Sequence, residues 1–198
     1  MDREDHIIEI RGGAAMLLQN EICCIEINID KTYTVGSADN RHYDITLNPR
    51  HYRQSDLPKT LSIHIDLYAK EYRIALIGPF HSYDFDCAVL EDELLTILQD
   101  DMITQIKVTN ASVIRNVMID CYGCNFAIYK VNKGYIIYGE IEITMLDFDL
   151  QKQWSFSGRD IFVSISDRNP FTIHENSICL YDFENNYYEI DFDGKQII

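Results

Sequence analysis

An internal repeat constrains the fold of this chain more than any other feature of its sequence. The segment LDFDLQKQW at 146–154 returns near the end of the chain as IDFDGKQII at 190–198. The similarity extends over 134–154 and 177–198, where matching residues lie 43 to 44 positions apart. The matches are Tyr138 with Tyr181, Asp147-Phe148-Asp149 with Asp191-Phe192-Asp193, and Lys152-Gln153 with Lys195-Gln196. The repeat indicates that copies of one structural unit build the second half of the chain.

A fainter third copy aligns residues 89–106 with residues 129–146. A period near 44 residues, with several short strands in each copy, is typical of β-propeller blades. The end of each copy predicts a hairpin turn, because an Asp side chain accepts hydrogen bonds from the main chain that follows it and Gly194 can adopt a positive φ. The identities that support the third copy are Ile97 with Ile137, Ile103 with Ile143, and Thr104 with Thr144.

The repeated ending resembles the blade ending of pyrroloquinoline-quinone-type propeller repeats, in which an Asp-containing strand runs into a Gly-Lys turn and often a Trp. The resemblance covers residues 85–198. Two or three such blades cannot close a ring, so it implies propeller-blade-like antiparallel repeats in an open or partial arrangement. No quinone or metal function is carried over, and we expect no cofactor. The matching positions are Asp191, Gly194 and Lys195 in the last copy, and Asp147, Lys152 and Trp154 in the earlier one.

The first half of the chain is predicted to form strands that expose one face of a sheet to solvent. Apolar and polar residues alternate over 23–30, and two further alternating rows over 60–78 are separated by a short AKE linker. Period-two alternation predicts an antiparallel sheet with one solvated side. The Gly-Pro of 77–86 marks a boundary, so we expect an antiparallel β region at 1–80 and an acidic β-repeat region at 81–198, either as two domains or as one continuous domain.

The segment 89–102 permits two interpretations. Its leucines at 90, 94, 95 and 98 have helical spacing, with acidic residues early in the segment. The repeat alignment instead predicts a turn at 91–93 followed by a strand. We favour the strand, and the whole chain is then expected to be mainly β.

The chain has a net charge of −15, and the charge is unevenly distributed. Residues 1–80 carry 9 Lys and Arg against 12 Asp and Glu (net −3), whereas residues 81–198 carry 8 against 20 (net −12). This acidity argues against nucleic-acid binding, which needs a basic surface. It can steer a basic protein partner, or it can simply keep a tyrosine-rich β surface soluble. With no secretory signal and no long apolar span, we expect a cytoplasmic protein without membrane contact.

Six cysteines and several Asp pairs invite a metal interpretation. In a cytosolic protein the cysteines are expected to be reduced and mostly buried. Cys121 and Cys124 have zinc-ligand spacing, but no second ligand pair lies at a convincing spacing in the sequence. The Asp pairs at 84/86, 147/149 and 191/193 are too few for calcium, and turn chemistry explains them better. We therefore predict no metal site.

The polar stretch 36–59 carries two copies of Arg-His-Tyr, at 41–43 and 50–52. Guanidinium groups suit phosphate and carboxylate geometry, and His can add a donor. These residues form the candidate ligand-binding set of an alternative function, a small-anion-binding protein or enzyme. The alternative interpretation, without any binding function, is a solvated loop around one short strand at 43–47. The candidate set is Arg41, His42, Arg50, His51 and Arg53.

No catalytic motif is recognisable: there is no nucleophile elbow, zincin helix, Walker loop or dinucleotide fingerprint. The preferred hypothesis is a non-enzymatic protein-interaction module with an acidic β-repeat face. In gross properties it resembles immunity proteins that neutralise basic toxins, which implies an inhibitor-like role. Unpaired strand edges make a homo-oligomer a further alternative. The candidate partner-binding residues are Tyr187, Tyr188 and Trp154, with Tyr135, Tyr138 and Phe156 as further aromatic candidates, each of which packing in the core would also explain.

Overall fold

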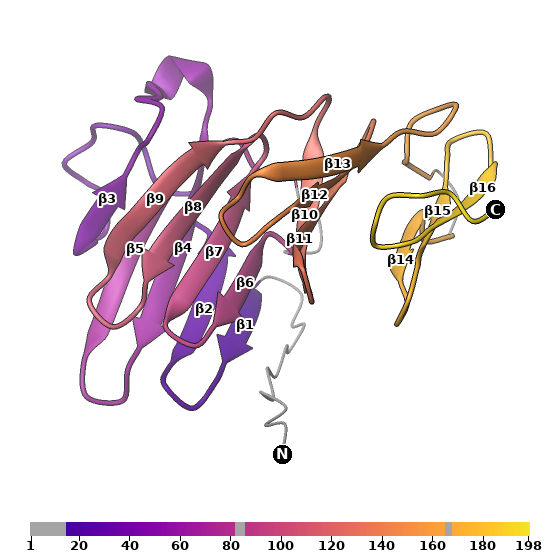
Figure 1. Cartoon of the computed structure of the whole chain (residues 1–198). Coiled ribbons are helices and arrows are strands. Elements are labelled where there is room, and N and C mark those ends of the chain that lie inside the picture. Colours follow the sequence, from indigo (N-terminus) through magenta and orange to yellow (C-terminus); the bar gives the residue numbers. More distant parts are fainter. Residues whose placement is uncertain (1–14, 82–85, 165–167) are drawn as a thin grey trace.

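The computed structural model describes residues 15–81, 86–164 and 168–198 (Figure 1). This part of the chain forms sixteen strands in four sheets and one short 3-10 helix, η1 (Gln54–Asp56). The sheets follow one another in chain order, and none closes on itself. The prediction of a mainly β fold with blade-like repeats in an open arrangement is therefore confirmed.

The first sheet is the one predicted from alternation. The two apolar rows face each other, with Ile63 opposite Ile74 and Leu61 opposite Leu76 across an antiparallel pair. The short strand β3 (Ile45–Leu47) runs parallel to its neighbour at the edge of this otherwise antiparallel sheet. The remaining strands, in spatial order, are β1 (Ala15–Gln19), β2 (Cys24–Ile29), β4 (Lys59–Asp66) and β5 (Glu71–Gly78).

The second and third sheets are four-stranded antiparallel meanders whose inner strands are buried on both faces. Their inner strands therefore read as continuous apolar runs without alternation, which explains the ambiguity of 89–102. That segment forms strands β6 and β7 with a turn at 92–93, so the helical interpretation is wrong. The strands are β6 (Ala88–Glu91), β7 (Leu94–Gln99), β8 (Met102–Lys107) and β9 (Ser112–Met118), then β10 (Asn125–Val131), β11 (Gly134–Gly139), β12 (Ile143–Leu146) and β13 (Lys152–Phe156).

The fourth sheet repeats the third in shortened form. It contains β14 (Phe171–Ile173), β15 (Ile178–Tyr181) and β16 (Tyr187–Ile190). After β16 the chain turns back, and Ile190 pairs with Gln196 in an isolated antiparallel bridge. The end of the chain thus takes the place that β13 has in the third sheet, and the two copies of the sequence repeat occupy equivalent positions.

The repeated Asp residues build the same turn in both copies. Oδ1 of Asp147 accepts hydrogen bonds from the N–H groups of Asp149 and Gln151, both at 2.9 Å. Oδ1 of Asp191 accepts the equivalent two bonds from Asp193 and Lys195, also at 2.9 Å. The fourth residue of each turn has a positive φ, +63° at Leu150 and +77° at Gly194. The predicted turn chemistry is confirmed for these two pairs, whereas Asp84 lies outside the described residues.

Consecutive sheets pack face to face over apolar cores. Ile65 and Leu95 belong to the core that the first and second sheets share, Leu98 and Ile137 to the next, and Ile136 and Leu180 to the core of the third and fourth sheets. Because one core joins residues on both sides of position 81, the first two sheets pack as neighbours. The boundary segment 77–86 lies partly outside the described residues, and the division into two domains stays a prediction.

The inner edge strands of all four sheets line one pocket of about 330 Å³. In a β-propeller, the innermost strand of each blade likewise lines a central channel. The lining residues are Met16, Leu18, Asp86, Ala88, Val89, Leu90, Ile128, Tyr129, Lys130 and Ile173. The described part of the chain has no helix with the length and apolar character needed to cross a membrane.

Candidate functional site

The two ends of this open stack are the outward faces of the first and fourth sheets. On the fourth sheet, side chains alternate between the core shared with the third sheet and the opposite face. Ile178, Leu180 and Tyr188 point into the core. The opposite face, called here the Tyr face, consists of Thr172, Cys179, Tyr181, Tyr187 and Glu189.

A tyrosine pair dominates the Tyr face. Tyr181 and Tyr187 are direct cross-strand partners, with ring centroids 5.1 Å apart and an interplanar angle of 47°. The guanidinium carbon of Arg168 lies 4.4 Å from the centroid of the Tyr181 ring. The Tyr187 hydroxyl donates to Glu189 Oε2 at 3.2 Å and lies 3.1 Å from Cys179 Sγ. The two rings are therefore held in place by the sheet while Tyr187 stays exposed.

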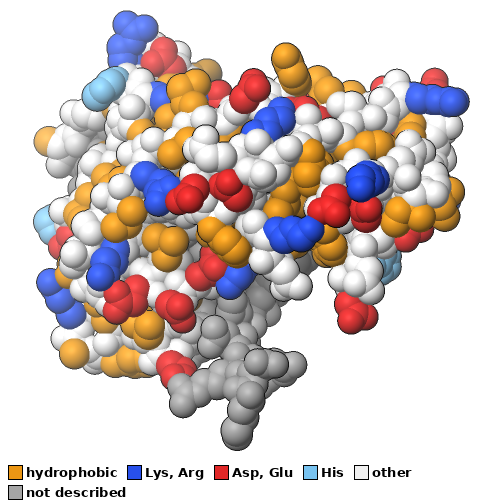
Figure 2. Space-filling view, in the orientation of Figure 1, with side chains coloured by type: hydrophobic (Ala, Val, Ile, Leu, Met, Phe, Trp, Pro, Cys, Tyr) orange, Lys and Arg blue, Asp and Glu red, His pale blue; other side chains and the backbone are white. Residues whose placement is uncertain are grey.

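The edge of the Tyr face is hollowed. Tyr187 also lines a pocket of about 440 Å³, together with Arg159 and Asn186. Residues 168–198 carry six Asp and Glu against one Arg and one Lys, a net charge of −4. On the face of the molecule in Figure 2, acidic and basic side chains are interspersed, so the negative charge there is spread rather than gathered in one patch.

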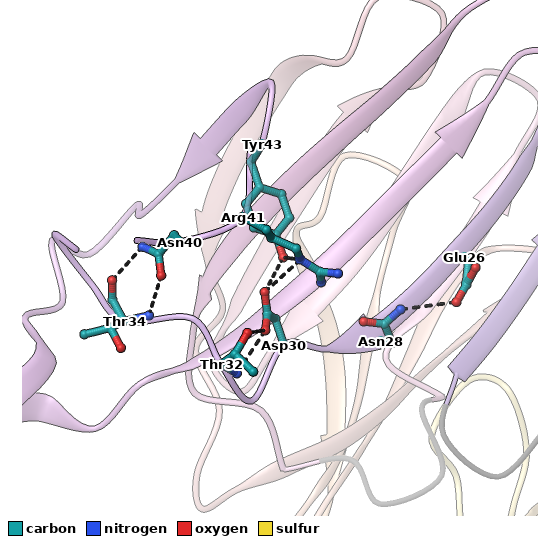
Figure 3. A network of polar contacts seen from close by, with 8 residues as sticks. All are labelled: Glu26, Asn28, Asp30, Thr32, Thr34, Asn40, Arg41 and Tyr43. Atoms are coloured by element: carbon teal, nitrogen blue, oxygen red, sulfur yellow. Dashed lines mark hydrogen bonds and ion pairs between the residues drawn. The ribbon is translucent and has the colours of Figure 1, made fainter. Parts of the chain in front are cut away.

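The outward face of the first sheet is different, because polar contacts within the chain occupy it. His64 Nε2 lies 3.0 Å from Glu71, and Arg73 lies 3.5 Å from the same carboxylate. The segment that follows β2 folds back, and the Tyr43 hydroxyl donates to Asp30 Oδ2 at 2.7 Å (Figure 3). This end of the stack is polar.

The carboxylate of Asp30 is the centre of that network. It accepts hydrogen bonds from the Thr32 N–H and hydroxyl at 2.9 and 2.6 Å, and Arg41 Nε lies 2.9 Å from it. Burial alone would raise the pKa of Asp30, but the hydrogen bonds from Thr32 and Tyr43 and the charge of Arg41 outweigh it and lower the pKa to about 2. Asp30 is therefore a structural anion, held ionised by its neighbours.

The structure distributes the Arg-His-Tyr candidates over separate partners. Besides Arg41 on Asp30, Arg50 pairs with Asp101 at 2.6 Å and Arg53 with Asp56 at 3.7 Å. His42 is exposed and lies 3.6 Å from Asp44, and His51 is exposed at a φ of +56°. Each guanidinium thus has its own carboxylate, and no contact among the five joins them. The anion site stays a prediction that these contacts do not favour.

The aromatic candidates divide between core and surface. Tyr188 is buried, and its hydroxyl donates to Asp182 and accepts from the Arg159 N–H. Trp154 is partly buried in the core of the third and fourth sheets and donates to the Phe192 carbonyl. Tyr187 is exposed. Of the further candidates, Tyr135 is buried, and Tyr138 and Phe156 pack against the same core as Trp154.

Sequence reasoning missed Tyr181 and Arg168. The signal for Tyr181 was the hairpin register: a turn over 182–186 places Tyr181 directly opposite Tyr187. Had the register been read from that turn, alternation would have separated exposed Tyr187 from buried Tyr188. No signal in the sequence could have placed Arg168 over the Tyr181 ring, because the contact depends on the path of a loop.

No family model and no curated protein matches this chain. Solved structures with a similar arrangement include Hsv2 of Kluyveromyces marxianus, at 8% identity and a TM-score of 0.42, covering 78% of this chain and 46% of Hsv2. The AfRom2 CNH domain is 11% identical, with a TM-score of 0.43 over 98% of this chain and 69% of that domain. A protein of unknown function from Bacteroides caccae is 10% identical, with a TM-score of 0.39 over 100% of this chain and 82% of that protein.

The chain thus spans about half the length of Hsv2, the first of these structures. At such identities and TM-scores the similarities assign no activity. The propeller-like description of the fold rests on the four sheets and their shared inner pocket.

Proposed function

We propose that this protein is a protein-interaction module that binds a basic protein partner on the Tyr face. The observation that carries the proposal is the Tyr181–Tyr187 pair, held across two strands on a sheet face that no other sheet covers in the described part of the chain. Tyr and Arg are the residues that most often dominate binding energy at protein interfaces. Rigid rings on a sheet also lose little side-chain entropy on binding.

The charge of the chain supports a basic partner. A net charge of −15 attracts a positively charged protein at long range and speeds its encounter. Because the visible charges are interspersed, the aromatic pair supplies local affinity and the overall charge supplies attraction. In the finer form of the proposal, the module inhibits the protein that it binds, as the resemblance to immunity proteins implies.

The test compares two variants of the tagged full-length chain. In Tyr181→Ala/Tyr187→Ala the pair is removed, and in Tyr68→Ala an exposed tyrosine is removed from the β4–β5 turn of the first sheet. Proteins retained from native lysate at low and high salt are identified by mass spectrometry, and folding is checked by circular dichroism.

We expect wild type and Tyr68→Ala to retain a basic protein that high salt releases. Loss of two interface tyrosines at about 1–2 kcal/mol each predicts at least about 30-fold weaker retention by the double variant. Equal retention by the folded double variant, or retention of an acidic protein, would contradict the proposal. Light scattering adds a second check: a wild-type dimer that the double variant dissociates would assign the face to self-association instead.

A further inference from the structure

The Cys121–Cys124 pair lacked a second pair of candidate metal ligands in the sequence, and the structure places His81 and Asp100 beside Cys124. The thiol of Cys124, the Nε2 or Nδ1 of His81 and a carboxylate oxygen of Asp100 all lie within 4.8 Å of one another. His81 follows β5 of the first sheet, Asp100 lies in the β7–β8 turn, and Cys124 immediately precedes β10. Residues 43 positions apart in the sequence thus meet at one point where three sheets end.

Hydrogen bonds hold these ligands in position. The Asn125 N–H donates to Asp100 Oδ1 at 3.0 Å, and His81 Nε2 lies 3.5 Å from Asp100 Oδ2. The buried Asn125 side chain donates to Cys121 Sγ at 2.9 Å. Outer partners of this kind orient metal ligands in established sites. Gly123, with a φ of +75°, allows the tight turn between the two cysteines.

The chemistry of the three ligands selects the metal. One thiolate, one imidazole and one carboxylate suit zinc, whereas calcium and magnesium take oxygen ligands. Tetrahedral zinc with bonds of about 2.0–2.3 Å places its ligand atoms roughly 3.5 Å apart. The ligand atoms of the observed group lie within 4.8 Å of one another, which is close to that spacing, and all three residues are partly exposed, so an ion can enter.

The local charge also favours a cation. The negative charges of Asp100 and Glu140 act on the position of the Cys124 thiol. The same carboxylates that oppose an isolated thiolate attract a divalent ion, which then stabilises the thiolate.

We propose that His81, Asp100 and Cys124 bind a zinc ion, with Cys121 as the fourth ligand. The spacing of Cys121 and Cys124 is that of two thiolates on one ion. The bound ion links the segment after β5 of the first sheet to the β7–β8 turn of the second sheet and to the segment before β10 of the third.

The experiment titrates the reduced, metal-free full-length chain with Co²⁺ and then with Zn²⁺. We expect one equivalent of Co²⁺ to bind with the visible spectrum of a tetrahedral site and a thiolate charge-transfer band, both abolished by Zn²⁺. Zinc should also raise the melting temperature, because it binds the folded state. Absence of saturable one-to-one binding would overturn the site.

Matched variants locate the ion. Loss of an outer-shell partner alone typically weakens metal binding about 10–100-fold, so Cys124→Ser and His81→Asn should each weaken it at least about 100-fold. Cys24→Ser and His174→Asn change the same residue types outside the group and should bind like wild type. Unchanged affinity in Cys124→Ser or His81→Asn contradicts the proposal.

Two further variants complete the test. If Cys124→Ser does not fold, Asp100→Asn keeps the side-chain shape and should still weaken binding. Cys121→Ser should reduce the charge-transfer band by about half, and an unchanged band would exclude Cys121 as the fourth ligand.

Discussion

The indole ring of Trp154 lies directly against the α-carbon of Gly194, so that a β-carbon added to Gly194 would be 2.6 Å from Trp154 Cδ2. The indole N–H also donates to the Phe192 carbonyl at 3.2 Å. One residue belongs to the outer strand of the third sheet and the other to the last turn of the fourth. The tip of one copy of the repeat therefore packs on the outer strand of the preceding copy.

Gly194→Ala is expected to destabilise the protein through this contact. The added methyl group forces the indole or the turn to move, and overpacking of this kind costs about 1–3 kcal/mol. Gly36→Ala is the matched control, because Gly36 has a similar φ (+80° against +77°) and open space around it. Urea unfolding of both variants separates the clash from the backbone strain. Equal losses would show that the contact with Trp154 contributes nothing.

Asp30→Asn should change how stability depends on pH. The folded pKa of about 2 lies below the ordinary value of 3.8, so ionised Asp30 stabilises the protein above about pH 4, and this contribution is lost as pH falls towards 2. The shift corresponds to roughly 2 kcal/mol at neutral pH. We expect the variant to be less stable than wild type by about this amount at pH 7, and we expect the difference to shrink to about 0.4 kcal/mol near pH 2.

The control for Asp30→Asn is Asp39→Asn, an exposed carboxylate in the same segment. Urea unfolding at pH 7, 5, 4, 3 and 2 gives the required series. A stability difference between wild type and Asp30→Asn that stays constant across this range would contradict the assignment of Asp30 as the anion of the network.

Tyr188→Phe and Tyr187→Phe test the assignment of neighbouring tyrosines to opposite faces. Removal of the buried Tyr188 hydroxyl takes a partner from Asp182 and from the Arg159 N–H, which should cost about 1–3 kcal/mol. Tyr187 is exposed, and its variant should stay within about 0.5 kcal/mol of wild type. Thermal unfolding measures both, and the reverse order of effects would mean that the register of β16 is wrong.

The buried cysteines should resist thiol reagents. Burial raises the pKa of Cys23 to about 11 and that of Cys87 to about 12, and both side chains are inaccessible. Because the thiolate is the reactive form, neither should react at pH 8 until the protein unfolds. Ellman titration of native and denatured protein, with peptide mapping of the modified sites, checks this. Fast modification of Cys87 in the native protein would contradict the packing of β6.

Local patterns predicted the parts of the fold that local chemistry determines. Alternation identified the first sheet because polar side chains on β2 and β4 alternate with apolar core residues, and the repeat aligned the third sheet with the fourth. The turn at Asp191 followed from an acceptor side chain and a glycine three residues later. The segment 89–102 was ambiguous for the opposite reason: a strand buried on both faces has no alternation, so its leucines matched helical spacing as well.

The candidate sites were harder to predict because they depend on contacts between distant residues. Arg50 meets Asp101, and His81 meets Asp100 and Cys124, only because consecutive sheets stack. The exposure of Tyr187 and the burial of Tyr188 depend on the register of one short hairpin. A single sequence does not reveal such pairings, since residue types and spacings along the chain are unchanged by them.

The difference between the two ends of the sheet stack limits the size of the assemblies that this protein can form. The outward face of the first sheet carries charged side chains that pair with one another, whereas the outward face of the fourth carries a tyrosine pair of which Tyr187 is exposed. A protein with two complementary binding surfaces at opposite ends can add copies without limit and form fibres. A protein with one such surface binds a single partner molecule and adds no more. The expected assembly is therefore a complex of two molecules with fixed stoichiometry.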